Sequence, residues 1–77
     1  MNRVEYLHKV IITAWQFLKK YELFPPESDA EQEQFFDGFT DAFASLAEAA
    51  PRESVERQFM LDVMTATSSY FQRKNRR

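Results

Sequence analysis

At 77 residues the chain is long enough for one small domain, and its net charge of −2 does not favour a polyanionic partner. It contains no cysteine and a single histidine, His8, which excludes disulfides, thiolate chemistry and the paired His or Cys ligands of a zinc site. Hydrophobic residues make up 44% of the chain and aromatic residues 16%, so the chain should fold. Small domains are usually stabilised by a disulfide, a metal or a second subunit, and of these only association with a second subunit remains.

The first predicted helix covers residues 2–23. Its apolar residues recur at steps of three and four, and we expect this stripe to face the core while Tyr6 and Lys9 lie on the wet face. The members of the stripe are Val4, Leu7, Ile11, Ala14, Leu18 and Tyr21. The helix has to end before Pro25, because residues that precede proline avoid helical backbone angles. His8 and Lys9 interrupt the apolar segment and no cleavage site of small residues follows, so we do not interpret it as a signal peptide.

The second predicted helix covers residues 29–49. Ser28 and Glu31 fit a capping box at its start, with Asp29 as a competing cap. The stripe that we expect in the core consists of Phe36, Phe39, Phe43 and Leu46. Gly38, the only glycine of the chain, lies inside this helix, where glycine is unfavourable. We expect it to permit the close approach of another helix.

The third predicted helix covers residues 52–72, with Pro51 at the break before it or in its first turn. Its stripe consists of Val55, Phe59, Val63, Ala66 and Tyr70. Residues 65–70 are poor helix formers, so we expect the helix to fray or bend after Met64. A basic tail over residues 73–77 follows. No apolar run in the chain approaches the ~18 residues that a membrane-spanning helix needs.

Three amphipathic helices with two proline-marked breaks predict an all-α fold, a three-helix bundle-like domain over residues 1–77. Acidic residues are concentrated in the middle of the chain, whereas both flanking segments are basic. In a compact bundle this distribution brings opposite charges together. Exposed pairs contribute only ~0–1 kcal/mol each, so charge supports the bundle weakly.

Each predicted helix carries more apolar residues than its stripe uses. A helix on the surface of a small bundle usually has an apolar arc little wider than ~100°, and contiguous apolar surface outside the core commonly marks an interface. We therefore expect the surplus residues to form a protein interface: Val10, Ile12, Trp15, Phe17, Phe35, Met60, Met64 and Phe71. A symmetric homodimer completed by these residues is the favoured interpretation. A groove for a different protein is the alternative, both can hold together, and a monomer that buries the surplus is the third.

Three acidic residues of the second helix, Glu33, Asp37 and Asp41, are spaced by four and therefore share one helix face. Carboxylates at this spacing are compatible with a divalent cation or an acid–base pair, but no histidine or second acidic helix joins them. We interpret them as a solvated face that can dock on a basic partner surface. His8 and the hydroxyl residues form no catalytic pattern, and the chain lacks a glycine-rich phosphate loop. We expect no cofactor, no metal and no enzymatic activity.

Basic residues gather at the C-terminus, where Arg73, Lys74, Arg76 and Arg77 could contact phosphates. They also suit the C-terminal end of a helix dipole, and the chain as a whole is not basic. We therefore predict a non-enzymatic, cytoplasmic regulatory protein that binds itself and another protein through apolar and acidic helix faces. It would inhibit or redirect that partner, as adaptors, anti-activators and phage- or plasmid-borne inhibitors do. The alternative is a small dimeric nucleic-acid-binding regulator that uses its basic N- and C-terminal segments.

Overall fold

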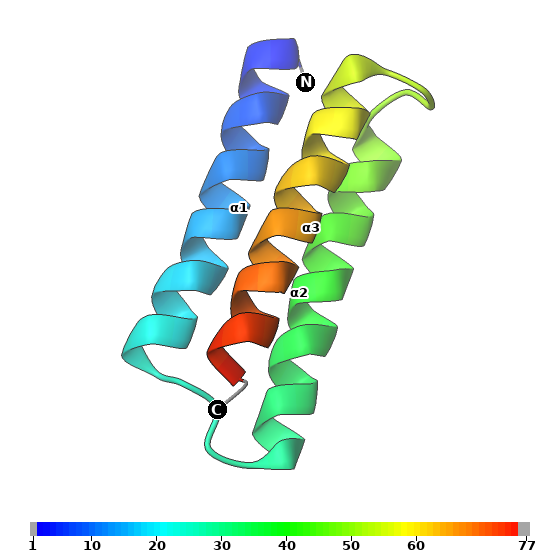
Figure 1. Cartoon of the computed structure of the whole chain (residues 1–77). Coiled ribbons are helices and arrows are strands. Elements are labelled where there is room, and N and C mark those ends of the chain that lie inside the picture. The colour runs from blue at the N-terminus through cyan, green and yellow to red at the C-terminus, as the bar shows by residue number, and fades with distance from the viewer. Residues whose placement is uncertain (1, 76–77) are drawn as a thin grey trace.

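The computed structural model describes residues 2–75, in which three α-helices form a bundle and no strand occurs (Figure 1). The helices are α1 (Arg3–Leu23), α2 (Asp29–Ala49) and α3 (Val55–Asn75). α1 and α3 run in the same direction, and α2 runs against both. The result is a rod with extents of 38 × 18 × 17 Å. The predicted all-α, three-helix architecture is confirmed.

The first two helices begin close to the predicted positions because polar side chains cap them. The side-chain oxygen of Asn2 accepts a hydrogen bond from the Glu5 backbone N–H at 2.8 Å. Ser28 caps α2, and its hydroxyl accepts from the Glu31 N–H at 3.1 Å. The Glu31 carboxylate in turn accepts from the Glu27 N–H at 2.9 Å. Such caps satisfy backbone donors that have no partner inside the helix.

α3 begins later than predicted, at Val55, because Ser54 caps it. The Ser54 hydroxyl accepts from the Arg57 N–H at 3.1 Å and donates to the Pro51 carbonyl at 2.8 Å. Glu53 has a φ of 61°, a left-handed conformation that an α-helix cannot include. Pro51 therefore lies in the loop before α3 and not in its first turn.

α3 also continues past Met64 without the predicted fraying and reaches Asn75. Tertiary contacts hold its poor helix formers in place. Thr67 is buried, and its hydroxyl donates to the Val63 carbonyl at 2.7 Å. One turn further on, Phe71 is completely buried. Packing of one face of the helix thus outweighs a weak intrinsic propensity.

The core is a cluster of aromatic rings contributed by all three helices. Phe71 of α3 stacks on Tyr21 of α1 at 4.7 Å between ring centroids, and it meets Phe35 of α2 edge-on at 5.0 Å. The Phe39 ring also approaches Phe71, at 5.7 Å. The largest fully buried side chains are Phe39, Phe43, Phe71, Met60 and Val10. Aromatic pairs add ~0.5–1.5 kcal/mol each beyond the area that they bury, so this cluster determines how the helices are rotated.

α1 is rotated relative to the prediction. Its buried residues are Tyr6, Val10, Ala14 and Tyr21. Val4 and Ile11 of the predicted stripe are 76% and 49% exposed, so their assignment to the core is wrong. Tyr6, expected on the wet face, enters the core because its hydroxyl donates to the Leu46 carbonyl at 2.8 Å. Burial raises the pKa of the Tyr6 phenol above its ordinary value.

α3 is rotated as well, whereas α2 follows the prediction closely. The buried residues of α3 are Met60, Thr67 and Phe71, and three members of its predicted stripe are half-buried: Phe59, Val63 and Tyr70. Val55 and Ala66 are exposed, so they do not belong to the core. The α2 stripe is confirmed at Phe39, Phe43 and Leu46. Phe35 is buried and Phe36 half-buried, the reverse of what the spacing predicts.

Gly38 is not needed for a close helix approach. A Cβ atom at this position would meet the Phe17 ring at 3.9 Å, an ordinary van der Waals distance. The expectation that glycine makes room for another helix is therefore wrong. We expect Gly38→Ala to raise the free energy of unfolding by ~0.5–1 kcal/mol, because alanine lowers the entropic cost of ordering the backbone. Urea denaturation of both proteins measures the difference, and a loss of stability would contradict the open geometry at this site.

The central position of Phe71 makes it the most sensitive test of the core. We expect Phe71→Ala to lower the free energy of unfolding by ~3–5 kcal/mol, close to the whole stability of a small domain. Phe24→Ala is the matched control, because the same atoms are removed from a side chain that is 75% exposed. Its effect should stay within ~0.5 kcal/mol. Urea unfolding followed by circular dichroism measures both, and equal losses would be incompatible with this core.

Candidate protein-binding surfaces

The apolar residues predicted for an interface do not lie together on the surface. Four of them are buried in the chain's own core, at most 5% exposed: Val10, Phe35, Met60 and Phe71. Expecting these four to be left over from the core is wrong. The rotation of α1 and α3 turns Val10, Met60 and Phe71 inward, and on α2 Phe35 takes the buried position that the spacing assigns to Phe36. Phe17 and Met64 are half-buried and pack against the core. Ile12 and Trp15 are exposed, by 36% and 55%.

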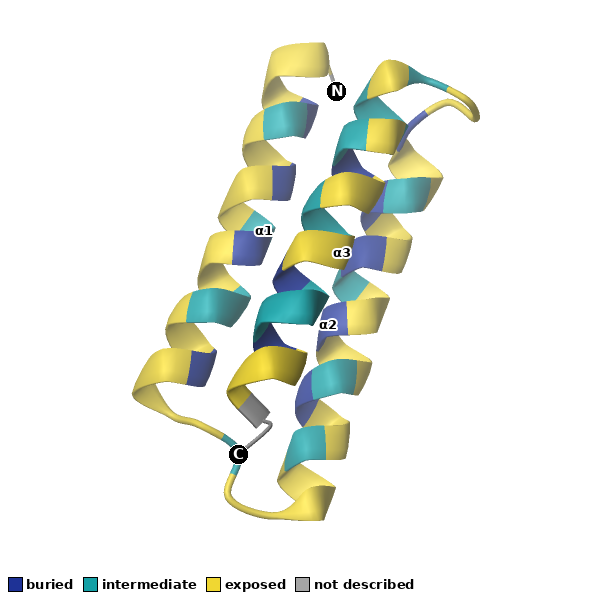
Figure 2. Ribbon diagram, viewed as in Figure 1, coloured by how far each residue is buried: buried dark blue, intermediate teal, exposed yellow. Residues whose placement is uncertain are grey.

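A different apolar surface lies on the outward side of α1. Its members, which we call the α1 strip, are exposed by 36% to 76%: Val4, Ile11, Ile12 and Trp15. Figure 2 shows this side of α1 as exposed along the helix, while the buried residues of α1 face α2 and α3. The sequence pattern contains a signal for Val4 and Ile11, the three–four spacing, but that spacing alone assigns them to the core.

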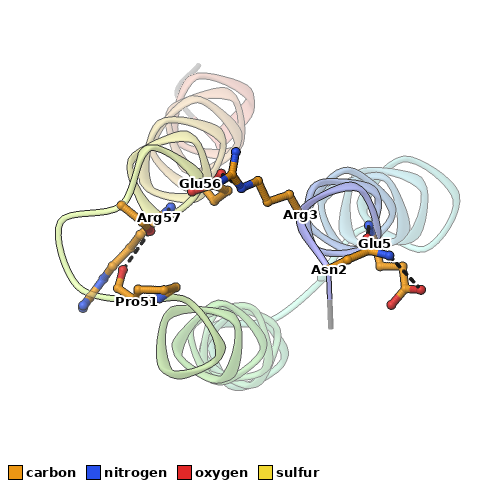
Figure 3. Close-up of polar contacts among 7 residues, drawn as sticks. Asn2, Arg3, Glu5, Pro51, Glu56 and Arg57 are labelled. Carbon is orange, nitrogen blue, oxygen red and sulfur yellow. Dashed lines mark hydrogen bonds and ion pairs between the residues drawn. The ribbon is translucent and has the colours of Figure 1, made fainter.

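The α1 strip borders the seam between α1 and α3. At one end of the seam the Arg3 guanidinium pairs with the Glu56 carboxylate at 3.4 Å (Figure 3). At the other end Glu22 of α1 pairs with Lys74 at 3.4 Å and accepts a hydrogen bond from the Tyr70 hydroxyl. Half-buried apolar residues follow the same flanks of the two helices between these contacts: Leu7 and Leu18 of α1, and Phe59 and Val63 of α3. The strip therefore continues into partly covered apolar surface.

The contacts of Glu22 form a surface clamp between α1 and α3. The hydrogen bond from Tyr70, together with the charge of Lys74, lowers the pKa of Glu22. The same hydrogen bond raises the pKa of Tyr70, and the Glu22 carboxylate raises the pKa of Lys74. The Lys74 ammonium also lies 5.9 Å from the centroid of the Tyr70 ring. Lys74, a predicted phosphate contact, is thus engaged by its own chain.

Of the other predicted phosphate contacts, only Arg73 lies within the described residues. Arg73 lies in the last turn of α3, and its Nε–H donates to the Ser69 carbonyl at 3.4 Å. A basic side chain in the last turn also interacts favourably with the helix dipole. Arg76 and Arg77 lie outside the described residues. The two described basic residues of the tail therefore both contact their own chain.

The acidic residues Glu33, Asp37 and Asp41 are all exposed on α2. α2 contains no lysine or arginine, so this face carries charge of one sign. Within residues 2–75, no three acidic or histidine side chains are arranged to hold a metal ion. A one-sign surface attracts a cationic partner and disfavours an acidic one. Its chemistry is that of electrostatic docking.

The hydrogen bonds of the described part of the chain join no serine or threonine hydroxyl to His8 or to a carboxylate. Ser28 and Ser54 cap helices, and Thr67 bonds within α3. His8 lies exposed on α1, one turn before Ile12. Ser28, Ser54 and Thr67 thus have structural roles in capping α2 and α3 and within α3.

No protein-family model matches the chain, and no curated protein or solved structure matches it. Among the helices of residues 2–75, none combines the length and the apolar character required to cross a membrane. The roles of the α1 strip and of the acidic face of α2 are therefore inferred from the residues that form them.

The clamp at Glu22 predicts a pH dependence. A carboxyl group with a lowered folded pKa stabilises the fold above its ordinary pKa of 4.5, and this contribution is lost as pH falls through the folded pKa. Tyr70→Phe should raise the pKa of Glu22 towards the ordinary value. The difference in stability between this variant and the wild type should be smaller at acidic pH than at neutral pH. Carboxyl NMR titration measures the shift. Lys74→Ala is the control and should move the pKa of Glu22 less, and the opposite order would contradict the hydrogen bond as the leading cause.

Proposed function

We propose that this protein is a non-enzymatic, cytoplasmic regulatory protein that acts by binding other chains. It pairs with a second copy of itself as a symmetric homodimer, and it holds another protein, which it inhibits or redirects. Adaptors, anti-activators and phage- or plasmid-borne inhibitors work in this way. Two surfaces of the chain support the proposal, one apolar and one acidic.

The α1 strip is the observation that carries this proposal. Trp15 and Ile11 are 55% and 49% exposed on the outward side of one helix. Monomeric proteins rarely expose contiguous apolar patches larger than a few hundred Å², and tryptophan is enriched among the residues that dominate binding energy at interfaces. Covering the strip with another chain removes this area from water. Its physical character is therefore that of a binding surface.

The acidic face of α2 supports a second binding surface. Glu33, Asp37 and Asp41 give it a negative potential that favours a partner with a basic surface. α2 packs on Phe17, which extends from the flank of α1 opposite the seam with α3. The two surfaces therefore point in different directions, and both can be occupied at once.

The nucleic-acid alternative has less support. Arg3, at the start of α1, lies at the opposite end of the rod from Arg73 and Lys74 at the end of α3 (Figure 1), and of the basic residues of α1 only Lys19 and Lys20 lie near the same end as these two. Glu22 adds a negative charge beside Lys74. Binding to a phosphate backbone favours a basic patch or stripe extended along one face.

Photo-crosslinking in host cells tests the proposed binding of another protein. A photoreactive residue in place of Asp41 is expected to trap one defined protein, and the same residue in place of Gln72, exposed on α3, is the control. Adding Glu33→Gln and Asp37→Asn to the variant with the photoreactive residue at Asp41 should lower the yield of the adduct about tenfold, because the attractive charge is lost. Equal adducts from both positions, or none, would contradict the proposal. Salt-sensitive binding to duplex DNA that disappears on deletion of residues 73–77 would favour the alternative.

A further inference from the structure

We infer that the α1 strip is the dimer interface, where two copies pack α1 against α1 in antiparallel orientation about a twofold axis beside Ile12. The inference rests on the proposed function and deepens it, because it names the surface that binds the second copy and the pairing of residues across it. Three independent features of the chain support it: exposed area, the position of the strip along α1, and the order of charges beside it.

The exposed area of the chain fits a second copy as the occupant. The molecule exposes 5826 Å² of surface, whereas a compact monomer of 9.2 kDa exposes about 4,900 Å². The difference of about 900 Å² is close to the ~800 Å² that each partner buries in an interface of standard size. The excess arises because three long helices form a narrow rod around a thin core. The excess is spread over the whole rod, and a second rod packed along one side removes part of it from water.

Three of the four members of the strip lie near the middle of α1, and Val4 lies towards its start. α1 runs from Arg3 to Leu23, so its midpoint is Thr13, and Ile11, Ile12 and Trp15 all lie within two residues of that point. A twofold axis beside Ile12 brings Ile11, Ile12 and Trp15 of the two copies close together around the axis. A strip near one end of α1 would leave half of each helix without a partner. The central position therefore favours an antiparallel self-pairing.

Charges flank the strip in the order that this pairing needs. Glu5 and Lys19 lie seven residues before and after Ile12, so all three share one side of α1. Both are exposed, and Figure 3 shows Glu5 pointing away from α2 and α3. Neither forms an ion pair within the described residues, and the Glu5 carboxylate accepts a hydrogen bond from the Asn2 side-chain N–H at 3.4 Å. Antiparallel pairing about Ile12 sets Glu5 of each copy opposite Lys19 of the other. A parallel pairing would set like charges together, which disfavours it.

A dilution series followed by light scattering and tryptophan fluorescence tests the interface, because Trp15 is the only tryptophan of the chain. The emission should shift to shorter wavelength as the dimer forms and Trp15 leaves water. Ile12→Lys should raise the dissociation constant of the dimer at least about 100-fold, since two isoleucines are lost and two ammonium groups meet at the axis. Leu61→Lys is the matched control: Leu61 is 42% exposed on α3, and its substitution should leave the dissociation constant unchanged.

A charge exchange tests the position of the axis. Glu5→Lys and Lys19→Glu should each raise the dissociation constant by about 2- to 30-fold, and the double variant should return to the wild-type value. Lys20→Glu is the control, because it makes the same change one residue away on another side of α1. Thermal unfolding of each variant separates effects on the helix ends from effects on pairing.

Several outcomes would overturn the inference. A protein that stays monomeric throughout the series, a dimer whose tryptophan emission does not shift, or a dimer that tolerates Ile12→Lys would each do so. Single charge variants that weaken the dimer without recovery in the double variant would overturn the axis at Ile12. Crosslinking from Asp41 does not depend on dimerisation, so an adduct formed by a monomeric protein would reject this inference and still support the binding of another protein.

Discussion

Phe71 stacks on Tyr21 with 4.7 Å between ring centroids, and both rings meet Phe35 edge-on. This triangle joins the three helices, and the rotation of α1 and α3 about their own axes depends on it. Each ring is large and rigid, so turning it towards solvent would expose more apolar area than any neighbouring residue could bury in exchange. Because a helix turns ~100° per residue, a Tyr21 ring that faces the core leaves Ile11 and Trp15 on the outward side of α1. The core and the α1 strip are therefore two consequences of one packing choice.

The sequence predicts α2 well and the rotation of α1 and α3 poorly, for a reason that lies in their residues. α2 has one apolar face opposite its acids, so only one rotation buries Phe39 and Phe43. α1 has two apolar stripes with helical spacing, one through Val10 and one through Ile11. The spacing alone does not show which of the two stripes faces the core. The decision comes from contacts between helices, such as the Tyr6 hydroxyl that finds the Leu46 carbonyl only in the assembled bundle.

The two candidate surfaces differ in how far the sequence defines them. Carboxylates spaced by four share a helix face whichever way the helix is rotated, so the acidic face of Glu33, Asp37 and Asp41 follows from spacing and from the absence of cations in α2. The α1 strip follows only after the core is known. The sequence correctly indicates that α1 is apolar on two sides, yet it assigns Val10 to the surface and Ile11 to the core, the reverse of their burial. A local feature such as the Ser28 cap can be predicted directly from the sequence. The rotation of each helix about its own axis depends on the packing of the whole bundle.

A symmetric dimer restricts which of the two surfaces can serve it. An isologous interface sets each patch against an identical patch, so a surface of one charge sign meets the same sign across the axis. The acidic face of α2 is therefore unsuited to self-pairing, because its carboxylates would face one another. The α1 strip has no such conflict, since its centre is apolar and Glu5 and Lys19 balance each other about Ile12. If the strip binds the second copy, the acidic faces remain on the outside of the dimer, one on each copy. A basic partner then meets a surface whose charge has not been used in assembly.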